Sequence, residues 1–162
     1  MTPDLRLTIK QHFDHDMDCA VKEVFETMLG VECSSIDSPP PSPAPDSTSV
    51  LIGLAGIISG SCILQIDATS SLRVASLLTG SNETGDEIVN DALGEVCNMV
   101  AGAWKRSLPE LVSSCLLSTP TVISGKDYNL HSPPQGLHLQ RHYQCGSESF
   151  TFAMQCVVPE RQ

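Results

Sequence analysis

The sequence has few aromatic residues, few basic residues and no long hydrophobic run. With one Trp, two Tyr and four Phe in 162 residues, its core must be mainly aliphatic. Nine basic residues stand against 19 acidic ones, and a net charge of −10 argues against nucleic acid or an anionic membrane as a partner. No stretch approaches the ~20 apolar residues of a membrane-spanning helix, and the N-terminal residues lack the apolar core of a signal peptide. We therefore expect a cytoplasmic protein.

The sequence also lacks the short motifs of several common activities. It contains no GxGxxG, no P-loop, no GxSxG and no HExxH, so nucleotide binding and triad hydrolysis have no support. There are seven cysteines but no CxxC pair. Because Cys62, Cys97 and Cys115 stand in apolar runs, the pattern predicts reduced thiols that serve as small hydrophobic side chains.

One amphipathic stretch, Asp86 to Leu108, stands out as a long helix with two contrasting faces. At ~100° per residue, one face is apolar and suited to a core. It carries Ile88, Ala92, Val96, Met99 and Ala103, widened by Val89, Leu93 and Val100. The opposite face carries Glu87, Asp91, Glu95, Asn98, Gly102 and Lys105.

The polar face of this helix is poorly designed for helix stability alone. Its three acidic residues lie four apart and repel one another by a few tenths of a kcal/mol per pair. Gly94 and Gly102 each cost up to ~1 kcal/mol relative to alanine in a helix interior. We infer that another molecule docks against this face, with the two glycines letting it approach closely.

The rest of the chain predicts a single domain over residues 1–162, of the α+β type. A helix is expected over residues 8–29, with Ile9, Phe13, Met17, Ala20, Val21, Val24, Phe25 and Met28 on its buried face. Residues 38–48 are rich in proline and serine and predict an exposed loop. Two apolar runs over 50–56 and 60–67 predict a central hairpin.

Further signals complete a mainly antiparallel sheet of about six strands with long helices packed on it. Asp67 or Thr69 can cap a short helix that Gly80 ends, and Thr84 with Glu87 has capping-box spacing. Strands are expected near 31–36, over 116–124 with an interruption at Pro120, over 137–144 and over 150–158.

Glu95 and Asn98 form the strongest candidate site, with Asp91 one turn earlier. At i, i+3 spacing, a carboxylate and a carboxamide project toward one external group. The amide can hold a water, and the carboxylate can engage a cation. No histidine or serine shares the stripe, so neither residue is a nucleophile beside a base. A solvated helix face explains the same spacing, and ExxN alone is a weak motif.

Two histidine clusters are weaker candidates for metal binding. His12 and His15 lie near Asp16 and Asp18 at helical spacing, and His138 and His142 share a strand face near Cys145. An exposed polar face accounts for each cluster better than a metal site does. We therefore expect no metal site in this chain.

The motif helix resembles that of the CheC/CheX/FliY family of chemotaxis and flagellar phosphatases. The family signature is an acidic residue, then Glu-x-x-Asn, then a small Ala-Gly pair, which Asp91, Glu95, Asn98, Ala101 and Gly102 match in DALGEVCNMVAGAWKRSL. Similarity extends to VFETMLGVE, GLAGIISGSCILQID and TPTVISGKDY. A single motif helix is most similar to CheX, since Ala20 and Glu23 stand in the first helix at the offsets that a second Glu/Asn pair would need.

The resemblance implies a phosphatase that acts on a phosphorylated CheY-type receiver domain. The aspartyl phosphate and its Mg²⁺ would belong to the receiver, and this chain would bind no cofactor. Asn98 would orient the attacking water, and Glu95 would engage the receiver's active-site lysine. Asp91, Gly94 and Gly102 would contribute to partner binding.

The chain departs from the family at one position, and the resemblance also implies a homodimer and an alternative function. Many family members have Asn after the Ala-Gly pair, where this chain has Ala103 followed by Trp104. Since Ala103 falls on the apolar face, we expect altered packing and not lost chemistry. CheX-like proteins pair through sheet edges, which implies a homodimer. The alternative is a non-catalytic receiver-binding or signalling-scaffold module that uses the same helix.

Overall fold

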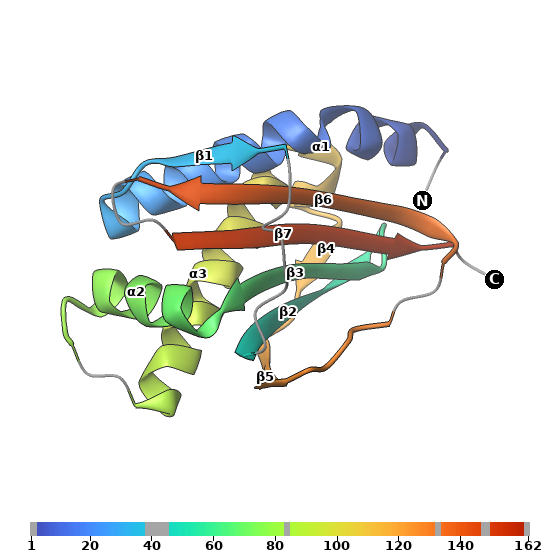
Figure 1. The fold of residues 1–162 in the computed structure, drawn as a ribbon. Helices are drawn as coiled ribbons and strands as arrows, with labels where there is room; N and C mark the ends of the chain where they lie inside the picture. The colour runs from blue at the N-terminus through green and yellow to red at the C-terminus, as the bar shows by residue number, and fades with distance from the viewer. Residues whose placement is uncertain (1–2, 38–45, 83–84, 132–133, 147–149, 161–162) are drawn as a thin grey trace.

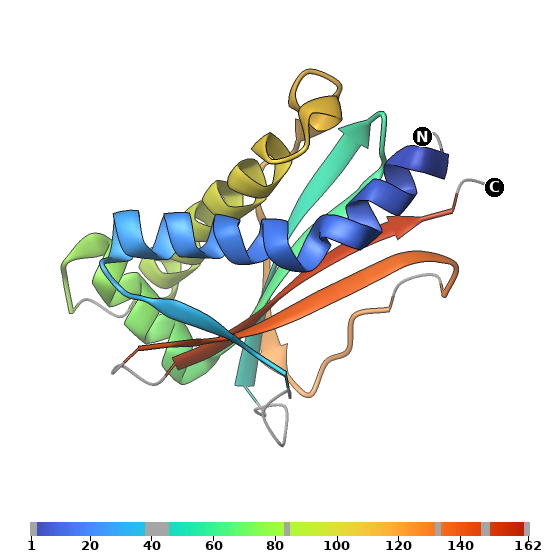
Figure 2. The same cartoon turned by 90° about the horizontal axis from the view of Figure 1, so that it is seen from above.

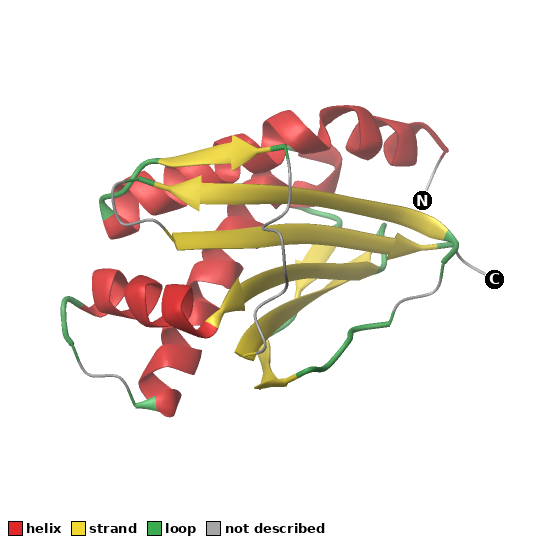
Figure 3. Cartoon of the chain, in the orientation of Figure 1, coloured by secondary structure: helices red, strands yellow, loops and turns green. Residues whose placement is uncertain are grey.

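The computed structural model describes residues 3–37, 46–82, 85–131, 134–146 and 150–160. They form a seven-stranded antiparallel sheet with helices on one side (Figures 1 and 3). The strand order is β1-β6-β7-β3-β2-β4, and β5 pairs with β2 beside β4. The strands are β1 (Cys33–Ile36), β2 (Asp46–Gly56), β3 (Gly60–Asp67), β4 (Cys115–Leu117), β5 (Thr121–Lys126), β6 (Gly136–Cys145) and β7 (Phe150–Pro159).

Two long helices, α1 (Pro3–Val24) and α3 (Asp86–Arg106), lie together on the same side of the sheet (Figure 2). Shorter helices are α2 (Ala68–Thr79), α4 (Pro109–Val112) and the π-helix η1 (Phe25–Leu29). The fully buried Trp104 of α3 meets Phe13 of α1 edge to face, with ring centroids 6.4 Å apart. One continuous cluster of mostly aliphatic side chains fills the space between these helices and the sheet. No helix in these described ranges is both long and apolar enough to cross a membrane.

The predicted central hairpin and mainly antiparallel sheet are confirmed, and the described residues form seven strands where about six were expected. β2 and β3 pair from Ser47 opposite Asp67 to Leu54 opposite Gly60, and β3 also pairs with β7. Residues 46–48 belong to β2, so the prediction of a loop over 38–48 was wrong at that end; 38–45 lie outside the described residues. The run 116–124 is split near Pro120 into β4 and β5, because proline cannot donate to a sheet ladder.

The C-terminal end of the first helix differs from the prediction at one side chain. Met28 is 45% exposed, and Leu29 is buried in its place. The cause is the π-helical turn η1, in which the amide of Gly30 donates to the carbonyl of Phe25, five residues earlier. A wider turn moves the buried position one residue along the chain. Gly30 ends the helix in the left-handed region, at φ 69°.

Helix α2 begins with a side-chain cap, whereas helix α3 does not. Asp67 caps α2, since its Oδ1 accepts a hydrogen bond from the Ser70 amide at 2.8 Å, and Gly80 ends the helix at φ 69°. For α3 the N-cap is Gly85, which supplies no side-chain cap. Thr84, the residue expected to cap that helix, lies outside the described residues.

Two of the seven cysteines depart from the predicted pattern of reduced thiols. Cys33 and Cys145 form a disulfide between β1 and β6. They are 112 residues apart in sequence, but the antiparallel register places them opposite each other with Cα atoms 4.1 Å apart. Only this pairing brings them together, so spacing along the chain gave no signal. Cys62, Cys97 and Cys115 are free and buried, as expected.

Candidate functional site

Helix α3 presents its candidate site on a face directed away from the core. Its buried residues are Val89, Ala92, Leu93, Gly94, Val96, Cys97, Val100, Ala101, Ala103 and Trp104. The predicted apolar face is therefore largely correct, and Ala103 is buried as expected; Ile88 and Met99 are half-buried at its borders. The helix keeps its first turn acidic and its last turn basic, which suits its dipole.

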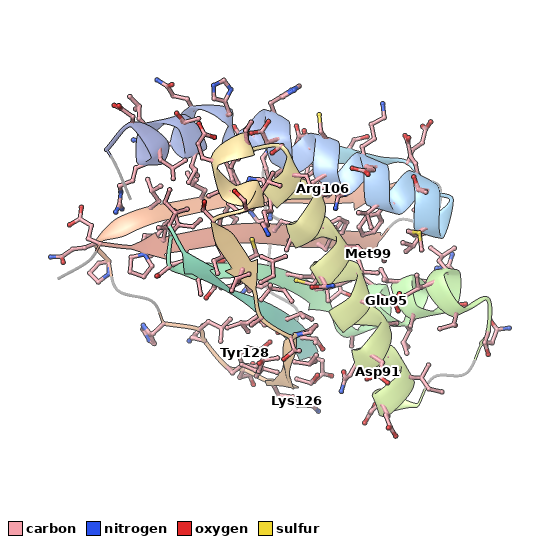
Figure 4. All side chains as sticks on the ribbon, turned by 180° about the vertical axis from the view of Figure 1, so that it is seen from behind. Asp91, Glu95, Met99, Arg106, Lys126 and Tyr128 are labelled. Carbon is pink, nitrogen blue, oxygen red and sulfur yellow. A yellow bond between two sulfur atoms is a disulfide. The ribbon has the colours of Figure 1, made fainter. Side chains whose placement is uncertain are left out.

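Asp91, Glu95 and Asn98 are all exposed on α3. Figure 4 shows Asp91 and Glu95 along this helix, on the side of the molecule that the helices cover. In the parts of the chain that the structure describes, no hydrogen bond or ion pair engages the side chains of Glu95 or Asn98. Both side chains are thus available to an external group, while their helix is held firmly by its buried face.

Gly94 has an internal packing role, and its predicted place on the docking face was wrong. It is buried, and a Cβ at this position would lie 3.3 Å from Cβ of Pro120. That separation is tighter than an ordinary van der Waals contact, so the missing side chain makes room for the segment between β4 and β5. The molecule that approaches Gly94 closely is therefore the chain itself.

Gly102 is half-buried and lies beside Arg106, one turn further along α3. A Cβ at position 102 would lie 3.6 Å from Nη1 of Arg106. The Arg106 guanidinium reaches α1, where its Nη2 contacts Oε1 of Glu23 at 3.4 Å. Arg106 follows Gly102 by four residues, and this i, i+4 spacing places the two residues on the same face of the helix.

The residues of α1 at the offsets of a second motif do not form a second site. Ala20 is buried at 2% exposure, and Glu23 is the partner of Arg106. A carboxylate at position 20 would point into the core between α1 and the sheet. The chain therefore has one candidate site, on α3, among the described residues.

A separate cavity of about 560 Å³ lies between α2, β5 and the first turns of α3. Its lining includes Asp46, Leu72, Asp86, Asn90 and Lys126. Neither Glu95 nor Asn98 lines it. Both side chains are exposed on the surface of α3, outside this cavity.

The histidine clusters do not form metal sites in the structure. Asp18 is engaged by Arg141 and Tyr143, and Cys145 is in the disulfide. Across the residues that are described, no three His, Cys, Asp or Glu side chains are grouped closely enough to hold a metal ion. Burial lowers the pKa of His142, which favours its neutral form.

The chemistry open to Glu95 and Asn98 is that of positioning groups. Asn98 can accept up to two hydrogen bonds through its carbonyl oxygen and donate two through its amide nitrogen, so it can hold a water in a fixed direction. Glu95 can engage a cation beside it. Neither side chain adjoins a general base, so a reaction at this face needs a partner that carries the electrophile and its activating groups.

Comparisons with known proteins agree on one family. A family model described as "Chemotaxis phosphatase CheX" matches residues 48–144, more than half of the chain. "CheY-P phosphatase CheX" of Thermotoga maritima is 36% identical over 90 residues, which is 54% of this chain and 58% of that protein. The aligned region thus spans less than two thirds of that relative.

Solved structures agree in fold over most of both chains. Chemotaxis protein CheX from Vibrio vulnificus has a TM-score of 0.72 and 27% identity, covering 89% of this chain and 95% of that chain. The CheX–CheY–BeF₃–Mg²⁺ complex from Borrelia burgdorferi gives a TM-score of 0.69 at 22% identity, covering 91% and 97%. The second likeness concerns the fold alone.

Proposed function

This chain belongs to the CheX family, and we propose that it dephosphorylates a phosphorylated receiver domain of the CheY type. The observation that carries the proposal is the exposed Glu95/Asn98 pair on the rigid α3, with no internal partner for either side chain in the described chain. The relative from T. maritima is named a CheY-P phosphatase, and the B. burgdorferi structure is a complex with CheY, BeF₃ and Mg²⁺. Both names fit a protein that acts on a receiver.

Asn98 is the catalytic residue of the proposal. Hydrolysis of an acyl phosphate needs a water placed in line with the phosphorus, and the loose transition state leaves the protein mainly a positioning task. A carboxamide on a convex helix can reach into the receiver's site and fix that water by two hydrogen bonds. The Mg²⁺ that neutralises the phosphoryl charge would come with the receiver.

Glu95 is the anchor of the proposal. It lies one turn before Asn98 on the same face, and the receiver's active-site lysine is the cation that it would engage. This ion pair would be largely shielded from water in the complex, which strengthens it compared with an exposed pair. Asp91, one turn earlier and also exposed, would extend the contact at its rim.

The direct test measures phosphate release from a panel of phosphorylated CheY-type receivers with the purified chain. We expect Asn98→Ala to lower the rate constant at saturating receiver by about 100-fold or more, in the range seen when one positioning or oxyanion group is removed. Glu95→Ala should raise the KM for the phosphorylated receiver more than Asn98→Ala does. Both variants should melt close to wild type, since both side chains are exposed.

The same assay separates catalysis from binding alone. A receiver-binding or scaffold module would form the complex but leave the receiver's own dephosphorylation rate unchanged. Full activity in Asn98→Ala would show that this residue does not position the water. The homodimer implied by the resemblance stays a prediction, which light scattering on the purified chain would test.

A further inference from the structure

The exposed face of α3 ends in a cation, Arg106. From Glu95, steps of three, four and four residues lead to Asn98, Gly102 and Arg106, so all four positions share one face of the helix. Figure 4 shows Glu95 and Arg106 along this helix, with Arg106 near its C-terminal end. The Cα of Arg106 lies about 12 Å beyond that of Asn98 along the axis.

The guanidinium lies nearer to Asn98 than the backbone spacing implies. Long helical side chains lean toward the N-terminus of their helix, and Nη1 of Arg106 would lie 3.6 Å from a Cβ at position 102. The charge therefore sits beside Gly102, about one helical turn past Asn98. A side chain that extends beyond Cβ at position 102 would compete for this space, which gives the small residue a role on the docking face.

The internal partner of Arg106 holds it only weakly. Nη2 lies 3.4 Å from Oε1 of Glu23, and the two side chains are 62% and 60% exposed. An ion pair that is so open to water contributes little, because water screens the charges and both side chains lose freedom. Arg106 can therefore leave Glu23 for a better-placed carboxylate, which its planar fork can bind through two parallel hydrogen bonds.

We infer that Arg106 is a docking residue that exchanges Glu23 for a carboxylate on the partner receiver, about one helical turn from the group that Asn98 reaches. The inference rests on the proposed function, since it assumes a receiver on this face. Carboxylates at Asp91 and Glu95 and a guanidinium beside Gly102 give the face opposite charges at its two ends. A reversed docking would oppose like charges, so Arg106 helps to fix the direction in which α3 lies on the receiver.

The test compares binding and turnover in Arg106 and Glu23 variants. The probe is a CheY-type receiver loaded with BeF₃⁻ and Mg²⁺ for the Kd, and the same receiver phosphorylated for the kinetics. Arg106→Glu should raise the Kd and the KM about 10-fold or more, with the rate constant at saturation within about two-fold of wild type. Arg106→Lys should recover part of the affinity, because it keeps the charge and loses the fork. Glu23→Gln should tighten binding by about two- to three-fold by removing the internal competitor.

Lys10→Glu provides the matched control for the change in net charge. Lys10 is exposed on α1, about 20 Å along that helix from Glu23, and the substitution changes the charge by the same amount. Equal changes in Kd for Arg106→Glu and Lys10→Glu would overturn the inference, as would tighter binding by Arg106→Glu. Thermal melting of each variant checks that the fold is intact.

Asn98→Ala in the same assays separates this inference from the proposed function. Loss of turnover in Asn98→Ala together with unaltered binding by Arg106→Glu would overturn only the role of Arg106. Full turnover in Asn98→Ala would overturn the catalytic proposal, while a selective affinity loss in Arg106→Glu would still support the docking role. A chain that binds no receiver would overturn both.

Discussion

Helices α1 and α3 are similar in length and lie on the same side of the sheet, yet their polar residues serve different ends. On α1, Asp18 accepts hydrogen bonds from Nε and Nη2 of Arg141 at 3.0 and 2.7 Å and from the Tyr143 hydroxyl at 2.8 Å. These bonds fasten α1 to β6. On α3, by contrast, Glu95 and Asn98 are exposed and have no such partner in the described chain. The comparison shows that a carboxylate on α1, Asp18, stabilises the fold, whereas a carboxylate on α3, Glu95, stays available to another molecule.

The comparison also explains why only one helix carries the motif. Position 20 of α1 faces the core at 2% exposure, whereas position 95 of α3 is exposed. The difference lies in how far each helix is rotated about its axis, which the packing of Phe13 against Trp104 helps to set. A Glu-x-x-Asn sequence written into α1 would therefore place its glutamate in the core.

The largest expected effect comes from testing that difference directly with Ala20→Glu. The new carboxylate would be buried without a partner, which should lower the free energy of unfolding by about 3–5 kcal/mol. Urea unfolding followed by circular dichroism measures this. Ala68→Glu is the control, since Ala68 is exposed at the start of α2 and its substitution should change stability by no more than about 0.5 kcal/mol. Equal stabilities for the two variants would contradict the assigned rotation of α1.

The next effect concerns the carboxylate that holds α1 to β6. Asp18→Ala removes three hydrogen bonds and leaves the half-buried Arg141 without that acceptor. The free energy of unfolding should therefore fall by about 2–3 kcal/mol. Asp91→Ala on α3 should change stability by about 0.5 kcal/mol or less, because Asp91 is exposed. Chemical unfolding of both variants checks the contrast. A cost for Asp91→Ala as large as that for Asp18→Ala would remove the distinction between the two helices.

A smaller effect is expected in the alkaline range from Tyr143, which also contacts Asp18. Burial and the hydrogen bond to the Asp18 carboxylate raise the pKa of the Tyr143 phenol well above its usual range. Because the folded pKa exceeds the unfolded value, this contribution to stability is complete below pH ~10 and is lost as the pH rises further. Stability measured from pH 8 to 11 should therefore fall less steeply above pH ~10 in Tyr143→Phe than in wild type. Parallel curves would contradict the shifted pKa.

The smallest effects are expected at the two glycines of α3. Gly102→Ala should raise the free energy of unfolding by about 0.5–1 kcal/mol, because alanine favours the helix and its Cβ meets Arg106 Nη1 at an ordinary distance of 3.6 Å. Gly94→Ala should raise the free energy of unfolding by less than this, or should lower it, because the new Cβ would press on Cβ of Pro120 at 3.3 Å. Thermal melting of the two variants measures the difference. A larger gain at position 94 than at position 102 would contradict the close packing of Pro120.

The elements that sequence analysis predicted well are those whose signals are local. The amphipathic pattern of α3, the caps at Asp67 and Gly80 and the apolar hairpin of β2 and β3 depend on neighbouring residues, so they could be found from the chain alone. The misplacement of Met28 arose because a single π-turn changes the helical period, which periodicity cannot reveal. The contact between Pro120 and Gly94 joins segments that are distant in sequence, so no local pattern of residues predicts it.

By itself, the sequence determined the helical course of α3 and the exposure of Asp91, Glu95 and Asn98, because a 3.6-residue period separates one helix face from the other. The tertiary structure alone decided which distant groups meet. Antiparallel pairing of β1 with β6 joined Cys33 to Cys145, and the packing of α1 against α3 brought Glu23 to Arg106. Such meetings follow from sheet register and helix rotation, which depend on the whole core and not on any segment of the chain.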